Sequence, residues 1–290
     1  MTEKRLNVGG VEWEYETAGR GRETLLLFHE AVGGAETMRA LAEGFADEFR
    51  TIALTVADVE TLDEVCDAAS AILDREHVAR AHVFGGSFGG LIAQAFLKRR
   101  AAQVETVTLL GTAAPDRKRI ARTARMSRLM RLIPFPLTRA LMKAEMSRHL
   151  GGPAQDGATA ERVAESRRRL EDYFDRRMTK RTLLSRIALS LDFNRNETYA
   201  PEDQAAWTGR VLIIESDDDP TLPEAERRAL RATYARALVC AFTGAGQMVT
   251  LLQPEALTQV VKAFIKDDYD SPSEIEDHSP ADHEHAAHDF

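Results

Sequence analysis

The sequence predicts an α/β protein with a mostly parallel central sheet that is flanked by helices and carries one inserted helical cap. Up to residue 113, short and continuously apolar segments alternate with amphipathic ones, which is the pattern of strands buried by the helices between them. The alternation stops at residue 114 and resumes after residue 200. A single interruption of a regular alternation indicates a sheet with a helical insertion.

The core elements before the insertion follow from apolar runs and turn residues. Two short strands, 5–8 and 11–17, flank a Gly-Gly turn. Residues 24–30, TLLLFHE, are an apolar run up to a glycine-containing loop, which is typical of a strand buried on both faces. We then expect a helix at 39–49, a strand at 50–56, an amphipathic helix at 61–75, a strand ending in the glycines of 80–90, a helix at 91–100 and a strand at 104–112.

The second half contains the insertion, a resumed core and a tail. Residues 114–200 are rich in arginine and helix-forming residues, with breaks at 134–136 and 151–153. Residues 1–113 and 201–266 form the expected core, and 114–200 the expected cap. Residues 267–290 contain nine Asp/Glu and no Lys/Arg, which predicts a disordered acidic tail. The resumed core consists of strands at 210–216 and 237–244 and helices at 224–236 and 254–265.

Composition limits the class of protein. Cys66 and Cys240 cannot form a disulfide framework and lack metal-site spacing, so we expect neither a metal nor another cofactor. The N-terminus lacks the apolar segment of a signal peptide, and no apolar run reaches the ~18 residues of a membrane span. We therefore expect a cytoplasmic protein without an integral membrane segment.

Basic residues are concentrated in the expected cap. Between Arg117 and Arg195 there are 20 Lys/Arg against 8 Asp/Glu, although the whole chain has a net charge of −8. The stretch RKRIARTARMSRLMRLIPF fits a cap helix that buries its apolar face over a pocket, a membrane-surface helix, or a surface for an anionic protein partner. We favour the first. The sequence contains no nucleic-acid-binding motif, so we do not expect nucleic acid as a partner.

The segment FGGSFGG carries the pattern Gly85-x-Ser87-x-Gly89 between an expected strand and an expected helix. A sharp reversal there holds the serine at the apex of a strained turn, and only glycine two positions away allows so close a backbone approach. The hydroxyl is then exposed above the sheet, and the Phe88 N–H lies at a helix N-terminus, ready to donate to an oxyanion. We therefore predict a nucleophile elbow at Ser87.

A serine nucleophile needs a general base, and the base needs a carboxylate that orients it. Three aspartates follow the expected strand 210–216, and the register of the next residues favours Asp219 as the acid, with Asp218 as the alternative. In a triad that follows such an elbow, the order along the chain is serine, acid, histidine. The place of the histidine, shortly after the strand expected at 237–244, is occupied by Gln247. An amide is neither usefully basic nor acidic near pH 7, so Gln247 could hydrogen-bond to Ser87 but could not activate it.

Two other histidines are candidates for the missing base. His29 ends an expected strand beside the loop where an oxyanion would be held, and His149 lies in the cap. We favour a structural role for both. The loop continues with Glu30 and Ala31 and lacks a glycine directly after the histidine. An ionised Glu30 would repel a developing oxyanion unless its side chain points away.

These motifs resemble those of the α/β-hydrolase superfamily over about residues 20–266, and within it those of maspardin and its relatives. Those proteins have a Gly-x-Ser-x-Gly-Gly elbow, which matches Gly85 to Gly90. They have TGGN at the place of TGAGQ, Thr243 to Gln247, and DQSALS where this chain has DDPTLP. The resemblance implies an α/β-hydrolase fold and a binding or adaptor role without demonstrated hydrolase activity.

Two functional hypotheses follow. The first is a degenerate hydrolase that binds a small apolar ligand, or a protein partner, with little or no turnover. The alternative is an atypical serine esterase or hydrolase that acts on a small ester through Ser87 with a displaced base. In both, the candidate site comprises Ser87, Asp219 and Gln247 as an incomplete triad, with Phe88, His29, Glu30 and Ala31 around the oxyanion position.

Overall fold

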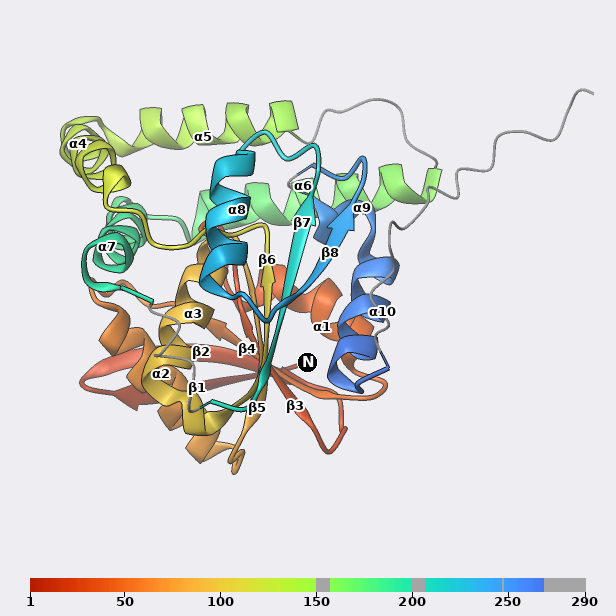
Figure 1. The fold of residues 1–290 in the computed structure, drawn as a ribbon. Helices are drawn as coiled ribbons and strands as arrows, with labels where there is room; N and C mark the ends of the chain where they lie inside the picture. The colour runs from red at the N-terminus through yellow and green to blue at the C-terminus, as the bar shows by residue number, and fades with distance from the viewer. Residues whose placement is uncertain (150–156, 200–206, 247, 269–290) are drawn as a thin grey trace, which may run out of the picture.

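The computed structural model describes residues 1–149, 157–199, 207–246 and 248–268 of the 290-residue chain. Its core helices lie on both faces of one sheet (Figure 1). The strands are β1 (Thr2–Val8), β2 (Val11–Ala18), β3 (Thr24–Phe28), β4 (Arg50–Thr55), β5 (Ala81–Gly86), β6 (Val104–Leu110), β7 (Arg210–Ser216) and β8 (Leu238–Phe242). The core helices are η1 (Ala35–Met38), α1 (Arg39–Phe45), α2 (Leu62–Arg75), α3 (Phe88–Arg100), η2 (Ala101–Gln103), α8 (Glu224–Thr233), α9 (Val249–Leu252) and α10 (Pro254–Ile265).

The strand order in this sheet is β1-β2-β4-β3-β5-β6-β7-β8. β1 and β2, and β2 and β4, pair antiparallel, whereas every later pair is parallel. The predicted mostly parallel sheet flanked by helices is therefore confirmed. Among the residues described between β6 and β7 lie four further helices, here called the cap helices: α4 (Lys118–Leu132), α5 (Phe135–His149), α6 (Gly157–Arg176) and α7 (Lys180–Asn196).

Several boundaries differ from the expected ones. The strand expected at 24–30 ends at Phe28, so His29 and Glu30 lie in the following loop. The helix expected at 91–100 begins at Phe88, because the chain enters it directly from the turn at Ser87. The short helices η1 and α9 were not expected. The expected break at 151–153 and nearly all of the expected acidic tail lie outside the described residues.

Each face of the sheet has its own apolar core. Ile72 of α2, Phe96 of α3 and Tyr234, directly after α8, belong to one buried cluster. Phe45 of α1 and Phe264 of α10 belong to the other, on the opposite face. Consecutive strand side chains point to opposite faces, so uninterrupted apolar strands feed both clusters at once. This burial holds the carboxyl ends of β5, β6 and β7 at fixed positions beneath the cap helices.

Polar groups of α7 tie the cap helices to the core. Glu197, just after α7, is almost fully buried and pairs with Arg99 of α3 at 2.6 Å. Asp192 accepts a hydrogen bond at 2.7 Å from the first residue of α2. Arg186 donates to the Val56 carbonyl oxygen at 2.6 Å. Because removing one partner of a buried polar pair is costly, these contacts fix α7 in a single position.

Gly89 permits the close approach of α3 to β3. A Cβ at this position would lie 2.2 Å from the Phe28 carbonyl oxygen, so Gly89→Ala should lower the free energy of unfolding by about 2 kcal/mol or more. Urea denaturation measures this change. Gly44→Ala is the control, because its Cβ would meet only the Thr258 side chain, at 3.0 Å, and helix propensity favours alanine by about 1 kcal/mol. Equal destabilisation by the two substitutions would contradict this account.

Candidate active site

Ser87 has the backbone conformation of a nucleophile elbow. Its φ of 49° and ψ of −112° lie in a region that non-glycine residues rarely adopt. Strain of this kind costs on the order of 1–3 kcal/mol and persists only where the surroundings impose it. Here the Ser87 N–H donates to Leu110 at 2.8 Å, and the Thr112 hydroxyl donates to the Ser87 carbonyl at 2.8 Å. A Cβ on Gly85 would lie 2.3 Å from the Gly89 oxygen, so glycine is required there too.

Two of the predicted oxyanion residues, Phe88 and Glu30, lie beside this turn. Phe88 is the first residue of α3, so its N–H has no acceptor within the helix. A carboxyl oxygen of Glu30 lies 3.7 Å from the position a Cβ would take on Gly86, which places Glu30 next to the elbow. Ala31 is half-buried and packs against the core. Phe88 and Glu30 thus lie beside Ser87, and Ala31 follows Glu30 in the same loop.

Glu30 has an unusual electrostatic environment. Solvent reaches part of its side chain, yet the surrounding protein is dense enough that desolvation raises the pKa of its carboxyl group. The negative charge of Asp219 raises this pKa further. A carboxyl group with a raised pKa is protonated over a wider pH range and can then donate a hydrogen bond. The repulsion expected of an ionised Glu30 is weakened to that extent.

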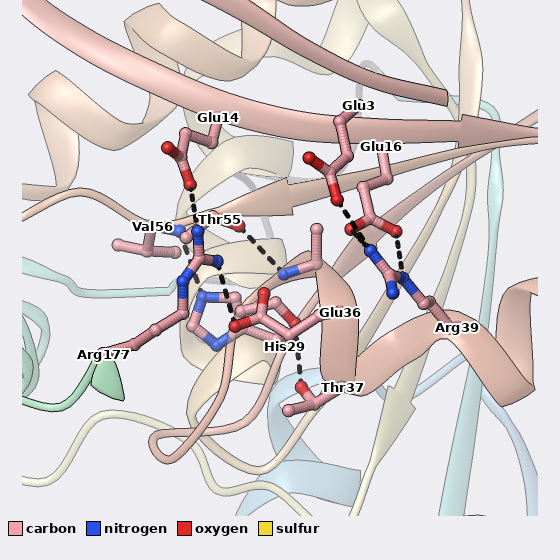
Figure 2. Close-up of polar contacts among 12 residues, drawn as sticks. Glu3, Glu14, Glu16, His29, Glu36, Thr37, Arg39, Thr55, Val56 and Arg177 are labelled. Atoms are coloured by element: carbon pink, nitrogen blue, oxygen red, sulfur yellow. Dashed lines mark hydrogen bonds and ion pairs between the residues drawn. The ribbon is translucent and has the colours of Figure 1, made fainter. Parts of the chain in front are cut away.

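His29 is fully buried and uses both ring nitrogens (Figure 2). Its Nδ1 lies 2.6 Å from the Glu30 carbonyl oxygen, which can only accept, so Nδ1 carries the proton. Its Nε2 accepts from the Val56 N–H at 3.0 Å. Burial lowers the pKa of His29 to about 3, and the nearby Arg186 charge lowers it as well. The favoured structural role fits this geometry, and His29 has no nitrogen left to take a proton from Ser87.

The two candidate acids differ in what they contact. Asp219 is buried, and its Oδ1 accepts from both the backbone N–H and the hydroxyl of Thr221 at 2.7 Å. Its Oδ2 lies 3.9 Å from the position of a Cβ on Gly111, directly after β6. Asp218 is exposed, and its Oδ1 accepts from Ser216 at 2.6 Å and from the Gly246 N–H at 2.9 Å. Of the two, Asp219 is the one whose charge acts on Glu30, beside the elbow.

Two predicted site residues cannot be placed. Gln247 lies outside the described residues; its neighbour Gly246 is described and binds Asp218. His149 is the last residue of α5, and its side chain is not described. His82 lies at the start of β5, opposite Leu25, and so at the end of the sheet away from Ser87.

The sequence did not single out the cap residues that reach the site. Arg186 of α7 lies over the Phe88 ring, 5.8 Å from its centroid, and is almost fully buried. Tyr173 of α6 is buried with Phe174 and Met178. Val32 packs against this cluster from the loop 29–34 between β3 and η1, here called the oxyanion loop. An arginine inside the apolar segment LLSRIALSL was the one available sign that α7 buries a charge.

A second set of ion pairs clamps the cap beside this loop (Figure 2). Arg177, just after α6, binds Glu14 of β2 at 2.8 Å and Glu36 of η1 at 3.0 Å. Arg39 of α1 binds Glu16 of β2 at 2.6 Å. A cavity of about 220 Å³ lies here, and Ser87 is not among its lining residues. Because its acidic and basic side chains largely pair with one another, we assign it no ligand.

Two further features are absent from the described residues. No cluster of three or more His, Cys, Asp or Glu among these residues could hold a metal ion. Separately, no helix among them combines the length and apolar character needed to cross a bilayer.

A mostly parallel sheet with a serine elbow after β5 and an acidic loop after β7 defines the α/β-hydrolase class of proteins. A family model described as the alpha/beta hydrolase family matches residues 25–260. The chain therefore belongs to the alpha/beta hydrolase family. No curated protein sequence matches it.

Solved structures share this fold at low sequence identity. A thermophilic esterase from Thermogutta terrifontis is 18% identical with a TM-score of 0.70, covering 92% of this chain and 99% of its own. An enol-lactonase from Burkholderia xenovorans is 19% identical with a TM-score of 0.71, covering 91% and 100%. A meta-cleavage product hydrolase from Pseudomonas fluorescens is 19% identical with a TM-score of 0.62, covering 92% and 98%. Identities this low establish the fold alone.

The hydrogen bonds of His29 predict its tautomer and charge. At pH 5 the ring should still be neutral with its proton on Nδ1, because burial lowers its pKa from 6.5 to about 3. Nitrogen-15 NMR of histidine-labelled protein, with His29→Asn to assign the signal, measures this state. The unfolded chain binds a proton between these pKa values and the folded chain does not, so His29 should reduce stability as pH falls through this window. An imidazolium signal from His29 at pH 5 would contradict the assignment.

Glu30 should act on stability in the opposite direction. Because its pKa is raised in the folded state, the folded chain holds a proton that the unfolded chain has released, and stability falls as pH rises above the ordinary value of 4.5. Glu30→Gln mimics the neutral carboxyl group. Its melting temperature relative to wild type should therefore rise between pH 4 and pH 8. Glu60→Gln, at an exposed position, is the control and should show no such trend. A flat difference for Glu30→Gln would exclude a raised pKa.

Proposed function

We propose that this protein is a cytoplasmic, ligand-binding member of the alpha/beta hydrolase family with little or no hydrolase activity, comparable in this respect to maspardin and its relatives. The observation that carries the proposal is a retained elbow without a usable imidazole. Ser87 keeps its strained conformation, whereas both nitrogens of His29 are engaged and the sequence has glutamine at position 247. A serine hydroxyl without a general base is a poor nucleophile near neutral pH.

Loss of the base affects the whole catalytic unit. The members of a Ser-acid-base triad act together, so removing the base alone lowers the rate by several orders of magnitude. Asp219 remains in a buried, hydrogen-bonded position, but a carboxylate in that place serves to orient an imidazole. Donors such as the Phe88 N–H can still bind a carbonyl oxygen. Binding with little turnover is the behaviour that this set of groups supports.

The polarity of the site favours a small, uncharged ligand. Phe88 directly follows Ser87 and supplies apolar surface, and the Phe88 N–H and the Ser87 hydroxyl supply two hydrogen-bond donors. Glu30, with its raised pKa, adds a third donor when protonated. An anionic ligand would meet the charge of Asp219 and of ionised Glu30. We therefore propose a small apolar molecule with a carbonyl or ester group.

An atypical serine hydrolase is the second candidate. The observation that favours it is the strain at Ser87, because a strained residue is often kept where it serves chemistry. In this alternative a displaced base, either His149 or a carboxylate of the site, takes the proton from Ser87.

Fluorophosphonate labelling separates the two candidates. Wild type should label no more than Ser87→Ala, because fluorophosphonates report an activated serine. Gln247→His should gain Ser87-dependent labelling of roughly tenfold or more, since it restores an imidazole at the position of the base. Gln103→His is the matched control, because Gln103 lies just before β6, at the end of the sheet away from the elbow.

Turnover of p-nitrophenyl butyrate, measured on the same four proteins, completes the test. Strong wild-type labelling and turnover that Ser87→Ala abolishes would refute the binding proposal and establish the serine hydrolase. Turnover that persists in Ser87→Ala would be background. It would not support a catalytic role for Ser87.

A further inference from the structure

We infer that the outer surface of α4 and α5 binds an anionic lipid surface, a role separate from ligand binding at Ser87. This α4–α5 surface consists of Arg122, Arg125, Met126, Arg128, Leu129, Leu132, Leu137 and Leu141, all of which are exposed. Figure 1 shows α4 and α5 at the periphery of the cap, with α6 between α5 and the sheet. The surface combines two properties that are rarely found together on an exposed helix face.

The first property is exposed apolar area. Leu132 is 81% exposed, and Leu137 and Leu141 are 54% and 58% exposed. The inner face of α5 is also apolar, because Phe135 and Met142 pack against the Tyr173 cluster. A helix that is apolar on opposite faces is usually covered on both. The inner face of α5 is covered by α6, and no element among the described residues buries the outer leucines.

The second property is positive charge without acidic residues. The sequence from Arg117 to Lys143 contains nine Lys/Arg and no Asp/Glu. Some of these cations are engaged, since Arg119 pairs with Glu226 and Lys143 with Asp175. Three on the outer face, Arg122, Arg125 and Arg128, form no ion pair with a carboxylate of the described residues. Their guanidinium groups therefore remain available to an external anion.

An anionic membrane matches both properties better than other occupants. Lipid headgroups neutralise the arginines while the leucines enter the boundary between headgroups and acyl chains. A second copy of the chain would bring the same basic segment against itself, which like charge opposes. The acidic residues 269–290 could neutralise the arginines, but Tyr269, Ile275 and Phe290 are their only large apolar residues. Binding to a lipid surface also does not require a groove in the protein. The outer faces of α4 and α5 are sufficient for such contact.

The helix predicted for this segment is present, but its apolar face is not buried as predicted. A cap helix that buries its apolar face was favoured for RKRIARTARMSRLMRLIPF, yet α4 has no buried residue, and Met126, Leu129 and Leu132 are exposed. The physical reason is that α4 packs with its other face on α7. Periodicity identified a helix with apolar residues but could not tell which of its faces would be covered.

Vesicle co-sedimentation of the full chain tests the inference. Wild type should bind vesicles of phosphatidylcholine with about 30% phosphatidylglycerol at about 20 mM NaCl, and lose most binding at about 500 mM NaCl, because salt screens the attraction. Pure phosphatidylcholine vesicles should bind at least roughly tenfold more weakly. Binding that is equal for both lipids and insensitive to salt would overturn the inference, as would no binding at all.

Charge and apolar variants locate the surface. Arg122→Glu/Arg125→Glu and Leu137→Ser/Leu141→Ser should each weaken binding about tenfold or more. Arg20→Glu/Arg22→Glu is the charge-matched control, because these exposed arginines precede β3 at the opposite end of the sheet. All six positions are exposed, so melting temperatures should stay near wild type. Equal loss in the control would overturn the assignment, as would self-association without lipid that Leu137→Ser/Leu141→Ser abolishes, which would identify a second copy as the occupant.

Discussion

The close backbone approach of α3 to the end of β3 is the constraint on which the site depends. A Cβ at Gly89 would lie 2.2 Å from the Phe28 carbonyl oxygen, and one at Gly85 would lie 2.3 Å from the Gly89 oxygen. With glycine at both positions, α3 starts directly above the strand ends, and Ser87 is forced into its positive φ. The same approach brings His29 and Glu30 beside the elbow. The candidate site is thus a consequence of helix–strand packing, whichever reaction or ligand occupies it.

The sequence predicted the parts of the fold that have local causes. Apolar runs identified the strands around Ser87, and the glycine spacing identified the turn, because each signal lies within a few residues. The roles of His29 and Asp219 needed contacts between distant segments. Whether a histidine is a base or a structural group depends on what its two nitrogens bind, and Val56 is far from His29 in the sequence. Arg186 was missed for the same reason: its partners belong to another part of the chain.

His29 and Glu30 show how one environment acts on opposite charges. The two residues are adjacent, and desolvation is the largest influence on both. It lowers the pKa of the imidazole and raises the pKa of the carboxyl group, so each is pushed toward its neutral form. Groups that are pushed toward their neutral forms beside the elbow suit an uncharged ligand better than the stabilisation of a strongly anionic intermediate. The glutamine at position 247 and the composition of the loop therefore support the same proposal.

The cap helices connect this site to the outer surface of the molecule through a single layer. Phe135, Met142 and Met146 on the inner face of α5 contact the cluster formed by Tyr173, Phe174 and Met178, and Val32 of the oxyanion loop packs on the same cluster. Leu137 and Leu141 lie on the opposite face of that helix. One cluster of packed side chains therefore separates the outer leucines from the loop. Arg177 ties the end of α6 to both β2 and η1. The cap is therefore held against the sheet by ion pairs on one side and left with exposed leucines on the other.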